Sequence, residues 1–60
     1  MNEKNFLTAS DVANYMGISV STAYKIIRQL NNELKKEGYI TIAGKISRIY
    51  FEKKIYGISA

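Results

Sequence analysis

Polar side chains that can donate hydrogen bonds recur at helical spacing in the middle of the sequence. The row comprises Ser19, Ser21, Thr22, Lys25, Arg28 and Asn32. Intervals of three and four residues bring side chains onto one face of a helix. Hydroxyl, amide and cationic groups on such a face can bind phosphate oxygens and the edges of bases. Such a face could recognise double-stranded DNA, a binding function without a chemical reaction; taken alone, the row also fits a solvated polar surface.

Catalytic and metal-binding chemistry has few candidate residues in this sequence. Histidine and cysteine are both absent. Their absence removes the usual general base near neutral pH, the commonest metal ligand, and any disulfide or thiolate zinc site. The carboxylates are scattered singly along the chain, so no acid/base pair is suggested. We therefore expect no enzyme activity, no metal site and no cofactor.

The charge of the chain agrees with an anionic partner. The net charge is +4 and the pI is near 9.5, and the basic residues other than Lys4 all lie beyond residue 24. Clustered bases on a domain with so high a pI are typical of nucleic-acid binding. Charge alone leaves open a soluble surface on which lysines happen to predominate. No stretch of apolar residues is long enough to span a membrane, and the first residues do not resemble a signal peptide. We therefore expect a cytoplasmic protein.

An amphipathic pattern predicts a long helix beneath the polar row. Apolar residues repeat at intervals of three and four between residues 23 and 34, which is the buried stripe of a helix of about 15 to 18 residues. Ser19 or Ser21 can cap its start, and Gly38 can end it. The last two turns, toward Lys36, are expected to lie beyond a DNA groove and to serve packing or self-association.

A shorter helix is predicted before the long one. Thr8 can cap it, with Asp11 returning the hydrogen bond as in a capping box. Its apolar face is formed by Ala9, Val12, Ala13 and Met16. Three residues then shape the turn between the helices: the small Ala13 lets them approach, Gly17 ends the first helix, and Ile18 enters the core. This turn would hold the second helix with its polar face outward.

A hairpin is predicted after the long helix. Residues 39–42 are rich in β-branched and aromatic types and predict a strand, and Ile46 begins the return strand. Gly44 supplies the positive φ of the turn between them. Gly44 and Lys45 at the tip, with Arg48 nearby, could reach a minor groove or its phosphates. A plain hairpin with a solubilising lysine is the alternative.

The segment after Ile46 fits two structures. It could continue the strand as far as Phe51, or Ser47 could cap a short third helix that ends at Gly57. The spacing of Phe51 and Ile55 favours the helix, although the two periods are hard to separate over so few residues.

The residues around the turn also carry a family pattern. They are Val12-Ala13, Met16-Gly17-Ile18-Ser19, Ser21-Thr22-Ala23-Tyr24 and Ile26. The pattern resembles the helix-turn-helix of the excisionase family and its mercury-regulator-like relatives, small DNA-binding proteins of phages and mobile elements. Residues 44–48 with Phe51 resemble, more weakly, the wing and short helix of the same proteins. Val20 departs from the pattern, because many members carry Arg there.

This resemblance implies a fold and a function. The fold is a winged helix-turn-helix, mainly α with a small β-hairpin, over residues 6–57 between tails at residues 1–5 and 58–60. The function is that of an excisionase-like accessory factor, bacterial or phage-encoded, that bends DNA during excision of a mobile element. A phage or plasmid transcriptional regulator fits the same sequence. An integrase or another phage or host protein is a further expected partner.

Each polar residue has an expected part in binding. Lys25 and Arg28 would read base edges or clamp phosphates in the major groove, and Lys45 and Arg48 on the wing would add a second contact. The hydroxyls of Ser21 and Thr22 would fix the register on DNA. The small footprint of one such module predicts cooperative binding or self-association.

A function of another class also fits the sequence. The chain could be a protein-interaction module that uses its helical face or its tyrosines. The tyrosines in question are Tyr24, Tyr39, Tyr50 and Tyr56.

Overall fold

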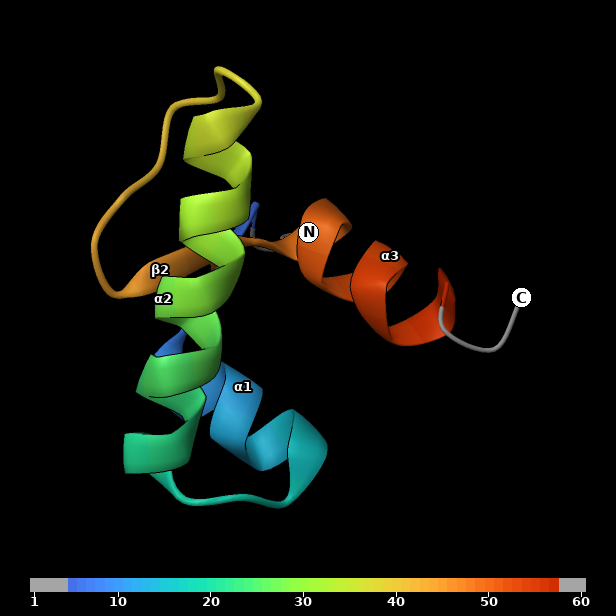
Figure 1. The fold of residues 1–60 in the computed structure, drawn as a ribbon. Coiled ribbons are helices and arrows are strands. Elements are labelled where there is room, and N and C mark those ends of the chain that lie inside the picture. Colours follow the sequence, from blue (N-terminus) through green and yellow to red (C-terminus); the bar gives the residue numbers. More distant parts are fainter. Residues whose placement is uncertain (1–4, 58–60) are drawn as a thin grey trace.

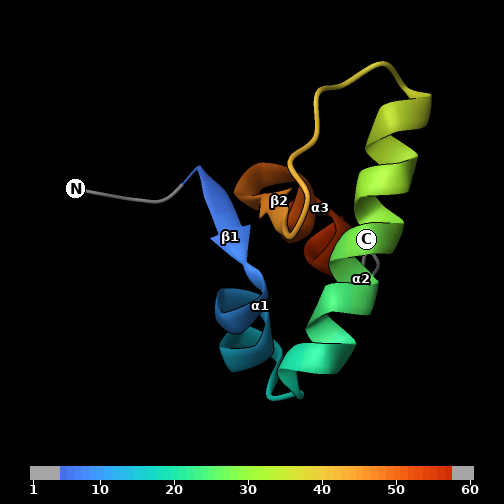
Figure 2. The ribbon, with the colours of Figure 1, turned by 90° about the vertical axis from the view of Figure 1, so that its left-hand side faces the viewer.

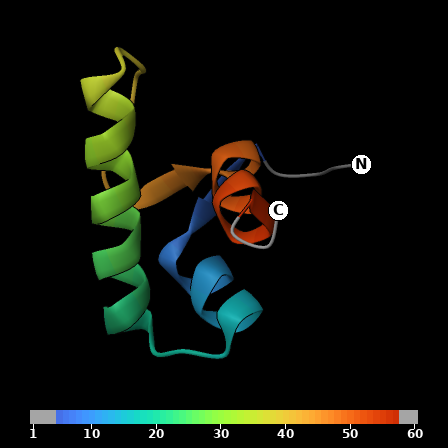
Figure 3. The ribbon, with the colours of Figure 1, turned by 45° about the vertical axis from the view of Figure 1, so that its right-hand side comes forward.

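One long helix forms one side of the fold, and the other helices and the strands pack together against it (Figures 1 and 3). The computed structural model describes residues 5–57, with only the backbone for residues 56 and 57. The elements in chain order are β1 (Phe6–Thr8), α1 (Ala9–Met16), α2 (Val20–Lys36), β2 (Lys45–Ser47) and α3 (Arg48–Gly57). Residues 1–4 and 58–60, which make up most of the predicted tails, and the Tyr56 side chain lie outside the described residues.

Helix α1 begins and ends at the predicted residues. The Thr8 hydroxyl accepts a hydrogen bond from the Asp11 amide at 3.2 Å, and the Asp11 carboxylate accepts one from the Thr8 amide at 3.0 Å. Gly17 ends the helix in the left-handed conformation, with φ 69°. The prediction that Met16 joins the buried face is wrong, because Met16 lies in the last turn, beyond the buried cluster, and is 42% exposed.

Helix α2 is held by local signals at both ends. The Ser19 hydroxyl accepts a hydrogen bond from the Thr22 amide at 3.2 Å, which makes Ser19 the N-cap. After residue 36 the chain reverses through Gly38, whose φ is 90°. The amides of Gly38 and Tyr39 donate to the carbonyls of Lys35 and Leu34, each at 3.0 Å, which is the Schellman arrangement. The predicted stop at Gly38 is confirmed.

The sheet differs from the predicted hairpin. Strand β2 pairs antiparallel with β1 (Figure 2), opposing Phe6 to Ser47, Leu7 to Ile46 and Thr8 to Lys45. The strand predicted at residues 39–42 is wrong, since only an isolated bridge joins Ile42 to Lys45. Strand propensity reflects packing on a half-buried surface, and this segment has no such surface, because Ile40 is 91% exposed. The partner of β2 comes instead from the start of the chain.

The segment after β2 is the predicted third helix. The Ser47 hydroxyl accepts a hydrogen bond from the Tyr50 amide at 3.3 Å and so caps α3. Phe51 on α3 is 2% exposed and meets the Tyr15 ring edge-on at 5.7 Å between centroids. The amide of Arg48 donates to the Asn5 carbonyl at 2.9 Å, which ties the start of α3 to the residue before β1.

The core draws on each of these elements except β1. Its buried apolar residues are Ala9, Val12, Ala13, Ala23, Ile27, Leu30, Leu34, Ile46 and Phe51. The apolar stripe predicted for α2 is therefore its packed face, with Ile26 partly buried beside it. This packing leaves the opposite face of α2 to solvent.

A polar cluster fastens α3 to α2. The Tyr50 hydroxyl donates to the Glu33 carboxylate at 2.8 Å, and the Lys54 ammonium lies 3.1 Å from the same carboxylate oxygen. The Lys54 nitrogen also lies 5.7 Å from the centre of the Tyr50 ring. The hydrogen bond from Tyr50, followed by that from Lys54, lowers the pKa of Glu33 below its ordinary value.

Replacing Glu33 by Gln is expected to flatten the acid side of the stability profile. A carboxylate whose pKa is lowered in the folded state stabilises it above the unfolded pKa, and this stabilisation is lost as the pH falls through the folded pKa. Urea unfolding at several pH values should show a lower unfolding free energy for Glu33→Gln at pH 7 and a shallower decrease toward pH 3. Glu37→Gln, one turn further along, should keep the acid decrease of the wild type. An unchanged profile for Glu33→Gln would contradict the role of this cluster.

Candidate nucleic-acid interface

The polar row of the sequence lies on the free side of α2. Ser21, Lys25, Arg28 and Asn32 are all exposed, and the face that carries them points away from the buried stripe. Figure 3 shows α2 at one edge of the fold, with α1, α3 and the strands on its other side. The structure therefore gathers these four residues on one accessible helix face.

The turn before α2 sets the angle between the first two helices. Ala13 is buried at the point where α1 meets α2, and Ala23 on α2 is fully buried. The amide of Ile18 donates to the Ala13 carbonyl at 3.0 Å, and the half-buried Ile18 side chain packs against the core. Gly17 takes the positive φ between them. These contacts present the first turns of α2 at an end of the molecule, which is the geometry of a helix-turn-helix (Figure 1).

The start of α2 is suited to an anion. Its first turn carries no acidic residue that would neutralise the positive end of the helix dipole. Ser19 and Thr22 are exposed but engaged with each other: the Ser19 hydroxyl donates to the Thr22 hydroxyl at 3.0 Å while capping the helix. They form a fixed hydroxyl pair beside the more open Ser21.

The wing is a loop with a tight turn at its tip, and it follows α2 back along its length (Figure 2). The Lys45 amide donates to the Ile42 carbonyl at 3.1 Å, and Gly44 in this turn has φ 78°. A Cβ on Gly44 would lie 3.7 Å from Cε1 of Tyr24. The tip therefore sits against the first half of α2, next to the polar face.

Asn31 holds this loop in place, a role that the sequence pattern did not predict. Its side chain is buried on α2, and its amide nitrogen donates to the carbonyls of Ile42 at 3.2 Å and Lys45 at 2.9 Å. Both bonds fall on the two residues that close the turn at the tip. The one signal in the sequence was an amide four residues after the apolar Ile27, at the edge of the buried stripe.

The two cations predicted for the wing lie at opposite ends of β2. Lys45 is exposed beside the tip, whereas Arg48 is the half-buried first residue of α3. The Arg48 guanidinium lies 3.4 Å from the Glu52 carboxylate. The structure therefore brings Gly44 and Lys45 close to α2, whereas Arg48 follows the far end of the strand.

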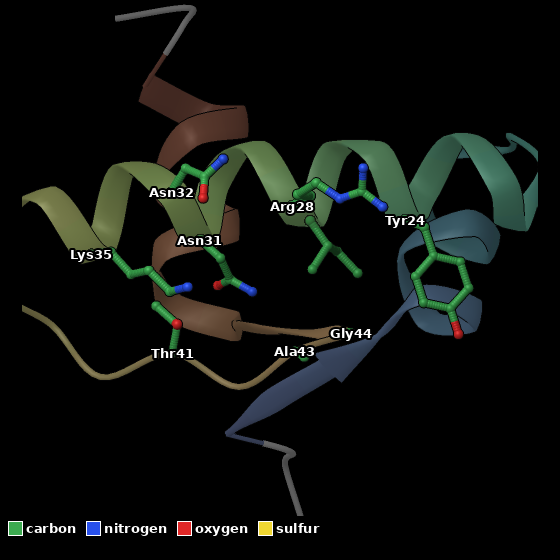
Figure 4. Close-up of a pocket in the computed structure, with 9 residues that line it drawn as sticks. Tyr24, Arg28, Asn31, Asn32, Lys35, Thr41, Ala43 and Gly44 are labelled. Carbon is green, nitrogen blue, oxygen red and sulfur yellow. The ribbon is translucent and has the colours of Figure 1, made fainter.

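An open groove separates α2 from the loop, and we call it the α2–loop groove. Its volume is about 490 Å³, and its polar walls include Tyr24, Arg28, Asn32 and Lys35 of α2 with Thr41 and Gly44 of the loop. In Figure 4 the Lys35 side chain extends from the helix toward the loop that carries Thr41. None of the described residues that line the groove is acidic. The groove thus widens the basic face of α2 on the side of the wing.

Comparison with known proteins adds to this geometry. Residues 1–55 match the Mga helix-turn-helix domain family. The chain belongs to the Mga helix-turn-helix domain family. It is also 48% identical over 48 residues to the ICEBs1 excisionase of Bacillus subtilis (strain 168), a match that covers 80% of this chain and 75% of that protein. No solved structure matches the chain.

These matches test the family and the fold class that the sequence predicts. The resemblance to excisionases inferred from the turn residues is confirmed, and so is the winged helix-turn-helix class. Among residues 5–57, which the structure describes, no helix combines the length and apolarity needed to cross a membrane.

Proposed function

We propose that this helix-turn-helix protein binds double-stranded DNA sequence-specifically and serves as an accessory factor in the excision of a mobile element. The observation that carries the proposal is the exposed polar face of α2, presented by a helix-turn-helix in a chain 48% identical to an excisionase. The protein supplies binding and shape. We assign the strand-breaking chemistry to a partner recombinase of the integrase type, because the sequence has neither histidine nor cysteine and its carboxylates are scattered singly.

Lys25 and Arg28 contact base edges or phosphates in the major groove, and the hydroxyls of Ser21 and Thr22 fix the register. The first turns of α2 enter the major groove, because the turn at Gly17 leaves them at an end of the molecule. Lys45 at the wing tip contacts the adjacent backbone or minor groove, and Arg48 adds to the positive field from the start of α3. Binding on two sides of one backbone favours a bent duplex, whose deformation costs of order 1–6 kcal/mol.

The test is binding of the complete chain to the attachment-site DNA of its element, with a scrambled duplex as control. If Lys25, Arg28 and Lys45 each displace a counterion, log K should fall against log salt with a slope of about −2.7 or steeper. Permuted fragments should also show a bend. Equal affinity for the two duplexes, or an affinity that does not depend on salt concentration, would contradict the proposal. Preference for promoter DNA without bending would favour a transcriptional regulator instead.

A second surface favours an additional protein contact. A second, more apolar groove is lined by Phe6, Leu34, Tyr39, Ile40, Ile49 and Tyr50, and the charged residues Glu37 and Lys53 also line it. Ile40 and Ile49 are 91% and 70% exposed. Exposed apolar side chains with both charge signs nearby suit a protein partner better than phosphate. We assign this groove to self-association between copies bound side by side on DNA.

Replacing Ile40 by Gln should reduce cooperativity without reducing affinity for one site. A buried amide without a partner opposes contact between copies, and it adds no charge beside the polar face of α2. The Hill coefficient on a fragment with repeated sites should fall toward 1, and the affinity for a single-site duplex should stay within about twofold. An unchanged Hill coefficient would refute self-association through this groove and would favour the recombinase as the partner that binds there.

A further inference from the structure

Helix α2 is longer than the groove that it is proposed to enter. Its 17 residues, at 1.5 Å each, extend about 25 Å, whereas the major groove of B-DNA is about 12 Å wide. If the helix crosses the major groove with the turns that carry Ser21 and Lys25 inside it, its last two turns lie over the sugar-phosphate backbone at the border of the groove. The far end of the polar face therefore meets phosphates.

The α2–loop groove lies beside this part of the helix. Arg28 and Lys35 reach it from α2, and Thr41 supplies a hydroxyl from the opposite wall (Figure 4). With two cations, a hydroxyl donor and no acidic residue among its described lining residues, the groove has the chemistry of a phosphodiester site. The apolar groove differs from it, because a glutamate lines that groove together with its lysine.

The loop wall of the groove is fixed before any ligand binds. Asn31 donates to the carbonyls of Ile42 and Lys45 on either side of the turn. The Schellman bonds at Gly38 fix the point where the loop leaves the helix. Leu34, which is buried, anchors the last turns of α2 to the core. A prebuilt groove of this kind binds without the cost of ordering a loop.

We infer that the α2–loop groove binds one sugar-phosphate strand of duplex DNA, with Lys35 and Thr41 as phosphate contacts and Asn31 as the positioning residue of the loop wall. The inference rests on the proposed function and extends it by a site whose affinity for DNA does not depend on the base sequence. It also gives the last turns of α2 a part in binding, in addition to the packing through Leu34.

The test compares Lys35→Ala with Lys36→Ala on the attachment-site duplex and on a scrambled duplex. Lys36 is the adjacent lysine, in the same last turn of α2, but it does not line the groove. Loss of one displaced counterion should weaken Lys35→Ala about eightfold at 0.1 M salt on both duplexes and make the salt slope shallower by about 0.9. Lys36→Ala should change both quantities less. Thr41→Val, which keeps the side-chain shape, should weaken binding with the slope unchanged.

Neutralising single phosphates by methylphosphonate substitution identifies the contact. One substitution should weaken the wild type and leave Lys35→Ala unaffected. In an Asn31→Leu background, adding Lys35→Ala should no longer change the affinity, while the circular dichroism spectrum stays helical. If the wild type binds duplex DNA but Lys35→Ala behaves as Lys36→Ala, the groove site is wrong and the proposed function stands. If the wild type binds no duplex, both are wrong.

Discussion

The Lys25→Ala/Arg28→Ala double variant is expected to lose DNA binding while keeping its fold. Each side chain lies on the exposed face of α2, opposite the buried stripe. Each well-placed contact contributes about 1–3 kcal/mol, so the pair accounts for about 2–6 kcal/mol, or at least a thirtyfold loss of affinity. Alanine is a better helix former than either residue, so the unfolding free energy should not fall. Fluorescence anisotropy with a labelled duplex measures the first quantity, and urea unfolding measures the second.

A charge-matched control separates contact from net charge. Lys36→Ala/Lys53→Ala removes two cations as well, but from the end of α2 and from α3. It should weaken binding much less at 0.15 M salt, where the Debye length is about 8 Å and distant charges are screened. Equal losses for the two double variants would mean that DNA responds only to net charge. A functional protein with intact recombination activity after loss of Lys25 and Arg28 would favour the protein-interaction role.

The helices were predictable because their signals are local. The capping pair Thr8 and Asp11, the cap Ser19 and the stop Gly38 each act within one turn of the residue that carries them. The buried stripe of α2 follows from spacing alone. The choice of a third helix after Ser47 was likewise decided by a cap and by residues four apart. The polar face of α2 and the turn that presents it could therefore be predicted from neighbouring residues alone.

The wing was mispredicted because its structure depends on residues far apart in the chain. The strand partner of β2 is β1, about forty residues earlier, and nothing in residues 39–42 reports that pairing. The loop is held by Asn31, 11 and 14 residues before its acceptors. Neither contact leaves a periodic signal. The α2–loop groove could not be predicted either, because its two walls meet only in the folded chain.

Phe51→Ala is expected to unfold most of the protein at 37 °C. Phe51 is among the largest fully buried side chains, at 2% exposure, and it joins α3 to the core. Truncation of a buried phenylalanine costs about 3–5 kcal/mol. A 60-residue domain at 0.05–0.15 kcal/mol per residue is stable by about 3–9 kcal/mol in all. The loss is therefore comparable with the whole stability, and far-UV circular dichroism should show a lower, broader melting transition.

Ile49→Ala on the same helix is the control, because Ile49 is 70% exposed and its truncation leaves no cavity. A change of less than about 1 kcal/mol on Phe51→Ala would contradict the packing role of α3. DNA supplies a further check, since a ligand that binds only the folded state stabilises it by about 2.7 kcal/mol at a hundredfold excess over Kd. Saturating duplex should therefore restore helical signal to Phe51→Ala, and the double variant of Lys25 and Arg28 combined with Phe51→Ala should stay unfolded. These two results together would show that DNA bound through Lys25 and Arg28 shifts the folding equilibrium of a protein whose core packing is weakened.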